Sequence, residues 1–182
     1  MRKSRLLGMM CALGLLMAGA QPALAYSKFL DDAGTVGAVG IPLFAGVFSL
    51  IHQDKEGAEQ LLLTYGATMG TSLALKKTID ATRPNGLPES FPSGHASSAF
   101  AGAAYLQRRY GLSYGLPAYA LATFVGYTRV HNDKHYWRDV AASAAIATVF
   151  AYVFTTSDDG LYVSAITDPS TNTYVMTAGL HF

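Results

Sequence analysis

Apolar residues in this chain gather into long segments, separated by short polar stretches or by stretches containing glycine and proline. After an apolar run near the amino terminus, we expect helices at 36–51, 58–75, 93–109, 116–129 and about 135–155. Gly40 and Pro42 should break the first of these, residues 82–92 should be irregular because they hold three prolines, and residues 111–115 should turn. Short connections favour antiparallel neighbours, so the pattern predicts an all-α bundle of about five core helices.

The amino terminus has the pattern of a secretory signal peptide. Basic residues at positions 2, 3 and 5 precede the apolar run 6–20, and Ala23-Leu24-Ala25 matches a small-residue cleavage site. We therefore expect residues 1–25 to be a signal peptide, residues 26–156 the bundle and residues 157–182 a separate tail. The alternative is an uncleaved signal that stays as an anchor and gives the bundle a sixth helix.

The tail differs from the bundle in composition. Residues 161–167 and 173–182 are rich in β-branched and aromatic side chains, and residues 168–172 between them contain proline, serine and asparagine. Strand-forming residues on both sides of a turn sequence predict a short C-terminal β-hairpin.

Composition limits the class of protein. Of 182 residues, enough for one domain, 51% are hydrophobic and only 14% are charged, so much of the chain is either buried or in a membrane. Cleavage after Ala25 would remove the single cysteine and three of 13 basic residues, leaving 10 basic against 12 acidic residues, a net charge of −2. With no basic stripe, nucleic-acid binding is not expected. The segments are slightly short of the roughly 20 residues that span a bilayer, so a membrane bundle and a soluble one both stay open.

The stretch Phe91-Pro92-Ser93-Gly94-His95 precedes a run of small residues. Proline stops whatever precedes it and Ser93 is a good N-cap, so a helix should begin here. The free amides and the positive dipole end of a helix start favour an anion, and Gly94 lets that anion approach the backbone closely. A plain helix cap has the same pattern, so this stretch alone does not define a site.

Two further blocks of polar residues flank this turn. Upstream, six residues separate Lys76 from Arg83; downstream, five residues separate Arg129 from His135, and three separate His135 from Asp139. These blocks lie at the C-terminal ends of the second and fourth expected helices and at the N-terminal end of the fifth. Successive helices of the bundle alternate in direction. Both blocks therefore return to the end of the bundle at which the third helix begins.

These residue types suit chemistry on a phosphoryl group. Lys76, Arg83 and Arg129 supply three cations, and a guanidinium binds phosphate oxygens through paired hydrogen bonds. The hydroxyl of Ser93 and the N–H of Gly94 would complete the cage. Any one of these cations taken singly would be a solvated surface charge, so the prediction depends on the set.

His135 and Asp139 lie four residues apart, so we expect them on one helix face, where the carboxylate holds one imidazole nitrogen. The other nitrogen is then free to attack phosphorus. A metal site on His131, His135 and Asp139 is the alternative, because their spacing also suits one helix face. That alternative needs helix from His131 onward, and it leaves the two arginines and His95 without a role.

The three blocks resemble the signature of the superfamily of type 2 phosphatidic acid phosphatases and vanadium haloperoxidases. The resemblance spans Lys76 to Asp139, with Thr128 where the family usually has serine. It implies that His135 forms a phosphohistidine, that His95 protonates the leaving oxygen and then activates water, and that no metal or other cofactor takes part. For the membrane members it also implies six spanning helices and a site that faces the periplasm.

These observations predict a metal-independent phosphomonoesterase or pyrophosphatase of the bacterial cell envelope, acting on a lipid or polyprenyl phosphate through a phosphohistidine intermediate. We expect it in the inner membrane with its site facing the periplasm; the alternative is a soluble periplasmic protein. Two other functions stay open, a vanadate-dependent haloperoxidase, for which the chain is short, and a non-catalytic protein that binds a phosphate headgroup. The presence of His95, His135 and Asp139 argues against the non-catalytic protein. The individual substrate and the oligomeric state are left undetermined.

Overall fold

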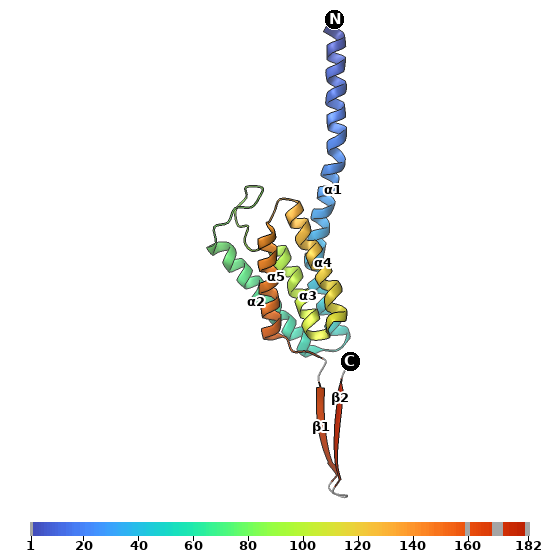
Figure 1. The fold of residues 1–182 in the computed structure, drawn as a ribbon, viewed down its shortest axis with the longest axis vertical. Coiled ribbons are helices and arrows are strands. Elements are labelled where there is room, and N and C mark those ends of the chain that lie inside the picture. Colours follow the sequence, from blue (N-terminus) through green and yellow to red (C-terminus); the bar gives the residue numbers. More distant parts are fainter. Residues whose placement is uncertain (1, 159–160, 169–172, 181–182) are drawn as a thin grey trace.

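The computed structural model describes residues 2–158, 161–168 and 173–180, with side chains described from residue 27 to residue 158. In chain order its elements are α1 (Arg2–Ile51), α2 (Lys55–Thr78), α3 (Gly94–Tyr110), α4 (Leu112–His131), α5 (Trp137–Phe154), β1 (Leu161–Asp168) and β2 (Thr173–Leu180). The expected all-α bundle of five helices is confirmed, and β1 and β2 pair antiparallel beyond it (Figure 1). The turn predicted between the strands lies outside the described residues at 169–172, and the signal peptide and domain limits stay predictions.

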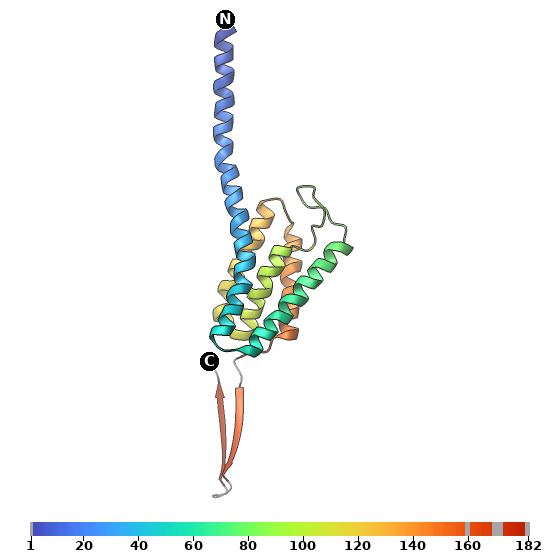
Figure 2. The same ribbon diagram turned by 180° about the vertical axis from the view of Figure 1, so that it is seen from behind.

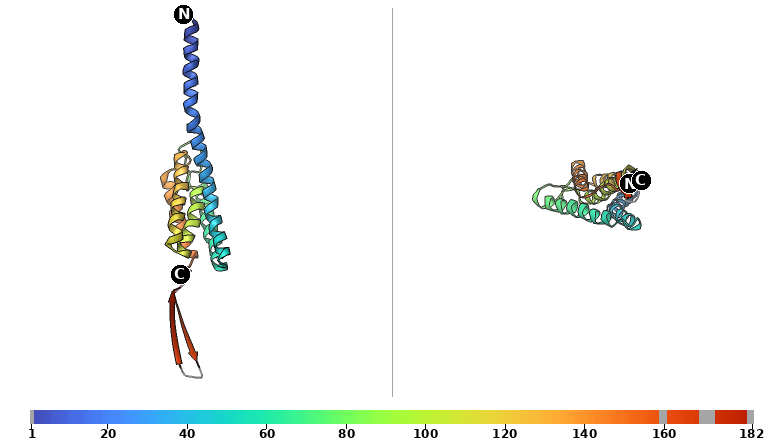
Figure 3. Two further views of the ribbon diagram at one scale, coloured as in Figure 1. Left: turned by 90° about the vertical axis from the view of Figure 1, so that its right-hand side faces the viewer. Right: turned by 90° about the horizontal axis from the view of Figure 1, so that it is seen from below.

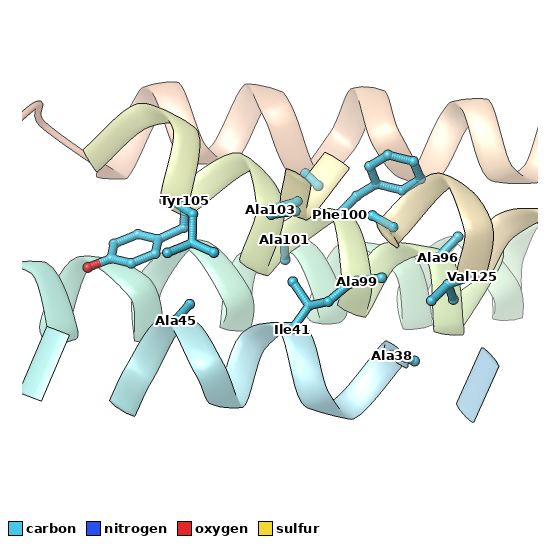
Figure 4. Packing of buried hydrophobic residues seen from close by; sticks show 14 of the residues in the cluster. Ala38, Ile41, Ala45, Ala96, Ala99, Phe100, Ala101, Ala103, Tyr105 and Val125 are labelled. Carbon is cyan, nitrogen blue, oxygen red and sulfur yellow. The ribbon is translucent and has the colours of Figure 1, made fainter. Parts of the chain in front are cut away.

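The central helix of the bundle is α3, which packs against each of the other four helices. Figure 4 shows its side chains against Ile41 and Ala45 of α1 and Val125 of α4. Most of its core positions are alanines with no exposed surface, at 96, 99, 101, 103 and 104. Small side chains let the neighbouring helices approach α3 closely.

The first helix is continuous through Gly40 and Pro42, which we expected to break it. The reason is its packing against Gly102 of α3. A Cβ at position 102 would lie 2.8 Å from the backbone nitrogen of Pro42 and 2.9 Å from its Cα. Because the backbones meet this closely, the packing stabilises the helical conformation across the proline.

Gly102→Ala is therefore expected to destabilise the protein by about 1–3 kcal/mol, because α1 and α3 must separate to admit the methyl group. Thermal unfolding in detergent micelles measures the change. Gly66→Ala in α2 is the matched control, since nothing lies within 4 Å of its Cβ position and alanine improves helix propensity by up to about 1 kcal/mol. Equal stability of the two variants would contradict the close approach.

Two other helix boundaries differ from expectation. The turn predicted over residues 111–115 is confined to Gly111, which has a φ of 84° and caps both α3 and α4. Only this one residue needs the left-handed conformation, so α4 begins directly after it. At the other boundary, α5 begins at Trp137 rather than near His135, because Tyr136 is the N-cap.

The outer surface of the bundle is apolar along much of its length. Large hydrophobic side chains are exposed on α1, α2, α4 and α5. Within the described residues, two helices are long and apolar enough to cross a membrane, Ser27–Ile51 and Trp137–Phe154.

Candidate active site

The three sequence blocks lie at one end of the bundle, where α2 and α4 end and α3 and α5 begin (Figures 1 and 2). The predicted site residues are placed as follows: Lys76 in the last turn of α2, Arg83 in the α2–α3 loop, Ser93 as the N-cap of α3, Gly94 and His95 in its first turn, Arg129 in the last turn of α4, His135 in the α4–α5 loop and Asp139 in the first turn of α5.

The turn at Ser93 is held from both sides. The Ser93 hydroxyl accepts a hydrogen bond at 3.4 Å from the backbone N–H three residues further on, as expected of an N-cap. Its backbone N–H donates to the carbonyl of Asp139 at 3.3 Å, and its carbonyl accepts from the Ser143 hydroxyl at 2.9 Å. The amides of Gly94 and His95 have no acceptor within the helix, so this fixed helix start offers donors to an anion.

Lys76 and Arg83 approach the site from α2 and from the loop that follows it. The Lys76 ammonium donates to the carbonyl of Glu89 at 2.8 Å, and its Cε lies 3.8 Å from the position a Cβ would take at Gly94. A hydrogen bond of 2.8 Å from the N–H of Arg83 to the carbonyl of Leu87 closes the loop. The Nε of Arg83 is buried, with no hydrogen-bond partner in the described part of the chain. It is therefore a donor available to a ligand.

Arg129 is almost fully buried, with 1% of its surface exposed. Its Nε donates to the hydroxyl of Thr128 at 3.2 Å, so the threonine found in place of the usual serine holds the guanidinium. Its Nη2 donates to the carbonyl of Asp31 at 2.7 Å and lies 2.9 Å from the Asp31 carboxylate. A Cβ at Gly34 would lie 2.5 Å from Nη2, so only glycine lets α1 pass this close to Arg129.

The His135–Asp139 pair forms, but not on one helix face as we expected. His135 precedes the N-cap Tyr136, and Asp139, in the first turn of α5, reaches back toward it. The Nδ1 of His135 lies 3.4 Å from Oδ2 of Asp139, too long and poorly aligned for a strong hydrogen bond. The same Oδ2 accepts from the Ser90 hydroxyl at 2.6 Å and from the N–H of Tyr136 at 3.0 Å. The carboxylate is therefore fixed beside Nδ1, and Nε2 is the ring nitrogen that does not face it.

The environment of His135 keeps its imidazole neutral. Burial lowers the pKa of His135 to about 4, and the positive charges of Lys76 and Arg83 act in the same direction, against the opposing charge of Asp139. At pH 7 the ring therefore carries a lone pair, which a nucleophile needs.

The alternative metal site does not form a common helix face. The fourth helix ends at His131 and the fifth begins at Trp137, so His131, His135 and Asp139 belong to three different segments. Across the described residues, no group of three or more His, Cys, Asp or Glu side chains is positioned to hold a metal ion.

Three residues that matter to this arrangement were missed from the sequence. Ser90 holds Asp139, Ser143 holds the turn at Ser93, and Asp31 binds Arg129. Ser143 lies four residues after Asp139 and so shares its helix face, which is a usable signal. Ser90 and Asp31 have no local pattern that distinguishes them from ordinary loop and helix residues.

An apolar groove of about 620 Å³ runs between α1 and α4 (the left view in Figure 3 shows these helices side by side). On α1 its lining begins at Ala33, next to Gly34, and extends to Phe44. On α4 the lining reaches Val125, one helical turn before Arg129. One end of the groove therefore lies about one helical turn along α4 from Arg129, which is not among the residues that line it.

One end of this helical bundle gathers three cations, a helix start and a buried histidine, which is an arrangement suited to a phosphate-like oxyanion. Residues 85–161 match the sequence profile of the PAP2 superfamily. The chain is similar to the lipid A 4′-phosphatase of Helicobacter pylori, with 32% identity over 127 residues that cover 63% of this chain and 64% of that protein. It is also similar to the lipid A 1-phosphatase of Porphyromonas gingivalis, with 36% identity over 75 residues, 39% of this chain and 17% of that one. The chain thus spans less than two thirds of the length of either relative.

Two crystal structures share the fold. The structure of Aquifex aeolicus LpxE matches with a TM-score of 0.62 at 23% identity, over 71% of this chain and 84% of that one. The structure of a transmembrane PAP2-type phosphatidylglycerolphosphate phosphatase from Bacillus subtilis matches with a TM-score of 0.59 at 19% identity, over 71% and 74%. The profile match covers residues 85–161, less than half of the chain, and the two crystal structures show that the fold is shared.

Proposed function

We propose that this protein is a membrane-bound phosphatase that removes phosphate from a lipid, and that the substrate class is a phosphorylated glycolipid of the lipid A type. The observation that carries the proposal is the buried neutral His135 near Lys76 and Arg83, at the end of the bundle where Arg129 also lies, with an apolar groove whose lining ends one helical turn from Arg129. A phosphate bound to the three cations would lie at the mouth of a groove suited to an acyl chain. The two lipid A phosphatases among the relatives support the glycolipid.

The first step is the transfer of the phosphoryl group to His135. The free Nε2 attacks phosphorus, and the bond from phosphorus to the lipid oxygen breaks as the N–P bond forms. Lys76, Arg83 and Arg129 neutralise the charge that spreads over the equatorial oxygens. His95 donates its proton to the departing lipid oxygen, so the lipid leaves as an alcohol.

The second step is hydrolysis of the phosphohistidine. His95, now neutral, takes a proton from a water molecule as that water attacks phosphorus. The N–P bond breaks, which releases inorganic phosphate and regenerates the free imidazole of His135. The proton taken up returns His95 to its starting state, so the cycle consumes one water and needs neither metal nor other cofactor.

We further propose that the bundle lies in the inner membrane with its site facing the periplasm. In the part of the chain that the structure describes, two helices are long and apolar enough to span, and much of the outer surface of the bundle is apolar. An exported amino terminus would bring the end that carries Arg129 and His135 to the periplasmic side, where lipid substrates of the outer leaflet are accessible.

Phosphate release from a lipid panel in detergent tests the proposal. The panel is lipid A, phosphatidate, phosphatidylglycerophosphate and undecaprenyl diphosphate, each assayed in the presence of EDTA. We expect release to be fastest from lipid A, unaffected by EDTA and inhibited by vanadate, which takes up the geometry of the transition state in the same cage. His135→Ala protein purified in parallel excludes a contaminating phosphatase. Activity lost in EDTA and restored by zinc or magnesium would overturn the metal-independent mechanism.

A further inference from the structure

Asp31 is an acidic residue placed among the cations of the site. Its Oδ1 lies 2.9 Å from Nη2 of Arg129 and accepts a hydrogen bond from the ammonium of Lys134. Lys134 immediately precedes His135, and its backbone N–H donates to the carbonyl of Arg129 at 3.0 Å. One carboxylate of α1 therefore joins the end of α4 to the loop that carries His135.

The same helix contacts the other histidine of the site. Thr35 follows Asp31 by one helical turn, and its hydroxyl lies 3.4 Å from Nε2 of His95 while also donating to the Asp31 carbonyl at 3.0 Å. The face of α1 that carries Asp31 and Thr35 thus covers the groups that a substrate phosphate would engage. A carboxylate and a phosphate oxygen make the same charge-assisted hydrogen bond to a guanidinium.

The two members of the ion pair differ in their freedom to move. The Arg129 side chain has 2% of its surface exposed and is held by Thr128, whereas the Asp31 side chain has 34% exposed. Because Lys134 also binds Asp31, the carboxylate keeps a cationic partner when it leaves Arg129. Displacing it therefore does not strand a buried charge, which would be costly.

We propose that the Asp31 carboxylate stands in for the substrate phosphate on Arg129, and that this competition sets how tightly the site binds phosphate groups. Before substrate binds, Asp31 neutralises Arg129 and limits repulsion among the clustered cations. A bound phosphate displaces it toward Lys134, and its return to Arg129 helps to expel the inorganic phosphate that the reaction leaves behind. This role rests on the proposed phosphatase function, and it makes Asp31 a residue that sets phosphate affinity rather than a catalytic one.

The test is the binding of inorganic phosphate to full-length protein in detergent, measured by calorimetry and by the rise in thermal unfolding midpoint. Asp31→Asn keeps the shape of the side chain but removes the charge. We expect it to bind phosphate about tenfold more tightly than the unmutated protein, and product inhibition to strengthen by the same factor. The control is Asp32→Asn, because Asp32 is exposed, forms no ion pair in the described part of the chain and carries the same charge one residue away. It should leave phosphate affinity unchanged.

The outcomes separate the two proposals. If Asp31 only anchors α1, Asp31→Asn binds phosphate no more tightly and the inference is overturned, whatever its effect on stability. If Asp31→Asn is less stable, phosphate should still raise its unfolding midpoint more than that of the unmutated protein, because tighter ligand binding gives greater stabilisation. If both proteins bind phosphate as expected but no lipid in the panel is dephosphorylated, the competition stands and the proposed function fails.

Discussion

His135→Ala is expected to abolish turnover of every phosphorylated substrate, with a loss of kcat of about 10⁵-fold or more. His135 is the buried neutral imidazole of the site, with Asp139 beside Nδ1 and Nε2 on the side away from that carboxylate. Without it no N–P bond forms, and the cations alone cannot supply a nucleophile. Steady-state phosphate release and acid-labile labelling of the protein measure the loss.

The control for this variant is His52→Ala. His52 is exposed at the end of α1, at the opposite end of the bundle from the site, so its loss should leave kcat within a few-fold. If His135→Ala kept more than about 1% of the original kcat, or still trapped a phosphoenzyme, another residue would have to be the nucleophile.

His95→Ala is expected to separate the two chemical steps. A lipid alcohol leaves badly as an alkoxide, so turnover of a lipid phosphate should fall by about 10²–10⁴-fold without an acid to protonate it. An aryl phosphate expels a stable phenolate and needs little help in the first step. An aryl phosphate should therefore phosphorylate His135 of the variant almost normally. The reaction should then stop, because His95 is also the group that activates water in the second step.

The observable is a stoichiometric burst of phenolate and an accumulated, acid-labile phosphoenzyme. Burial and the charges of Arg129 and Lys134 lower the pKa of His95, and the negative charge of a bound phosphate would favour its protonated form. Equal losses for the lipid and the aryl substrate, with no burst, would mean that His95 only binds phosphate and that the acid lies elsewhere.

Much of the site follows from the sequence because helix direction alternates along the chain. Lys76, Ser93 and Arg129 lie at helix ends. Because consecutive helices run in opposite directions, the order of the helices along the chain determines at which end of the bundle each helix end lies. The expected helix face shared by His135 and Asp139 was wrong, because Tyr136 caps α5 and leaves His135 in the loop. The two side chains still meet, since Asp139 stands in the first turn and faces back toward the cap.

The sequence by itself determined the helical class, the end of the bundle at which the candidate site lies and the residue types gathered there. Those features depend on apolar periodicity, cap residues and the charges of named side chains, all of which are local. Only the tertiary structure decided that Asp31 binds Arg129, since the two lie 98 positions apart and no periodicity links them. Such a contact depends on how closely α1 approaches α4, and that distance is set by the absence of a side chain at Gly34. The distance between two helices depends on the side chains of both helices, so the residue pattern of one helix alone does not predict it.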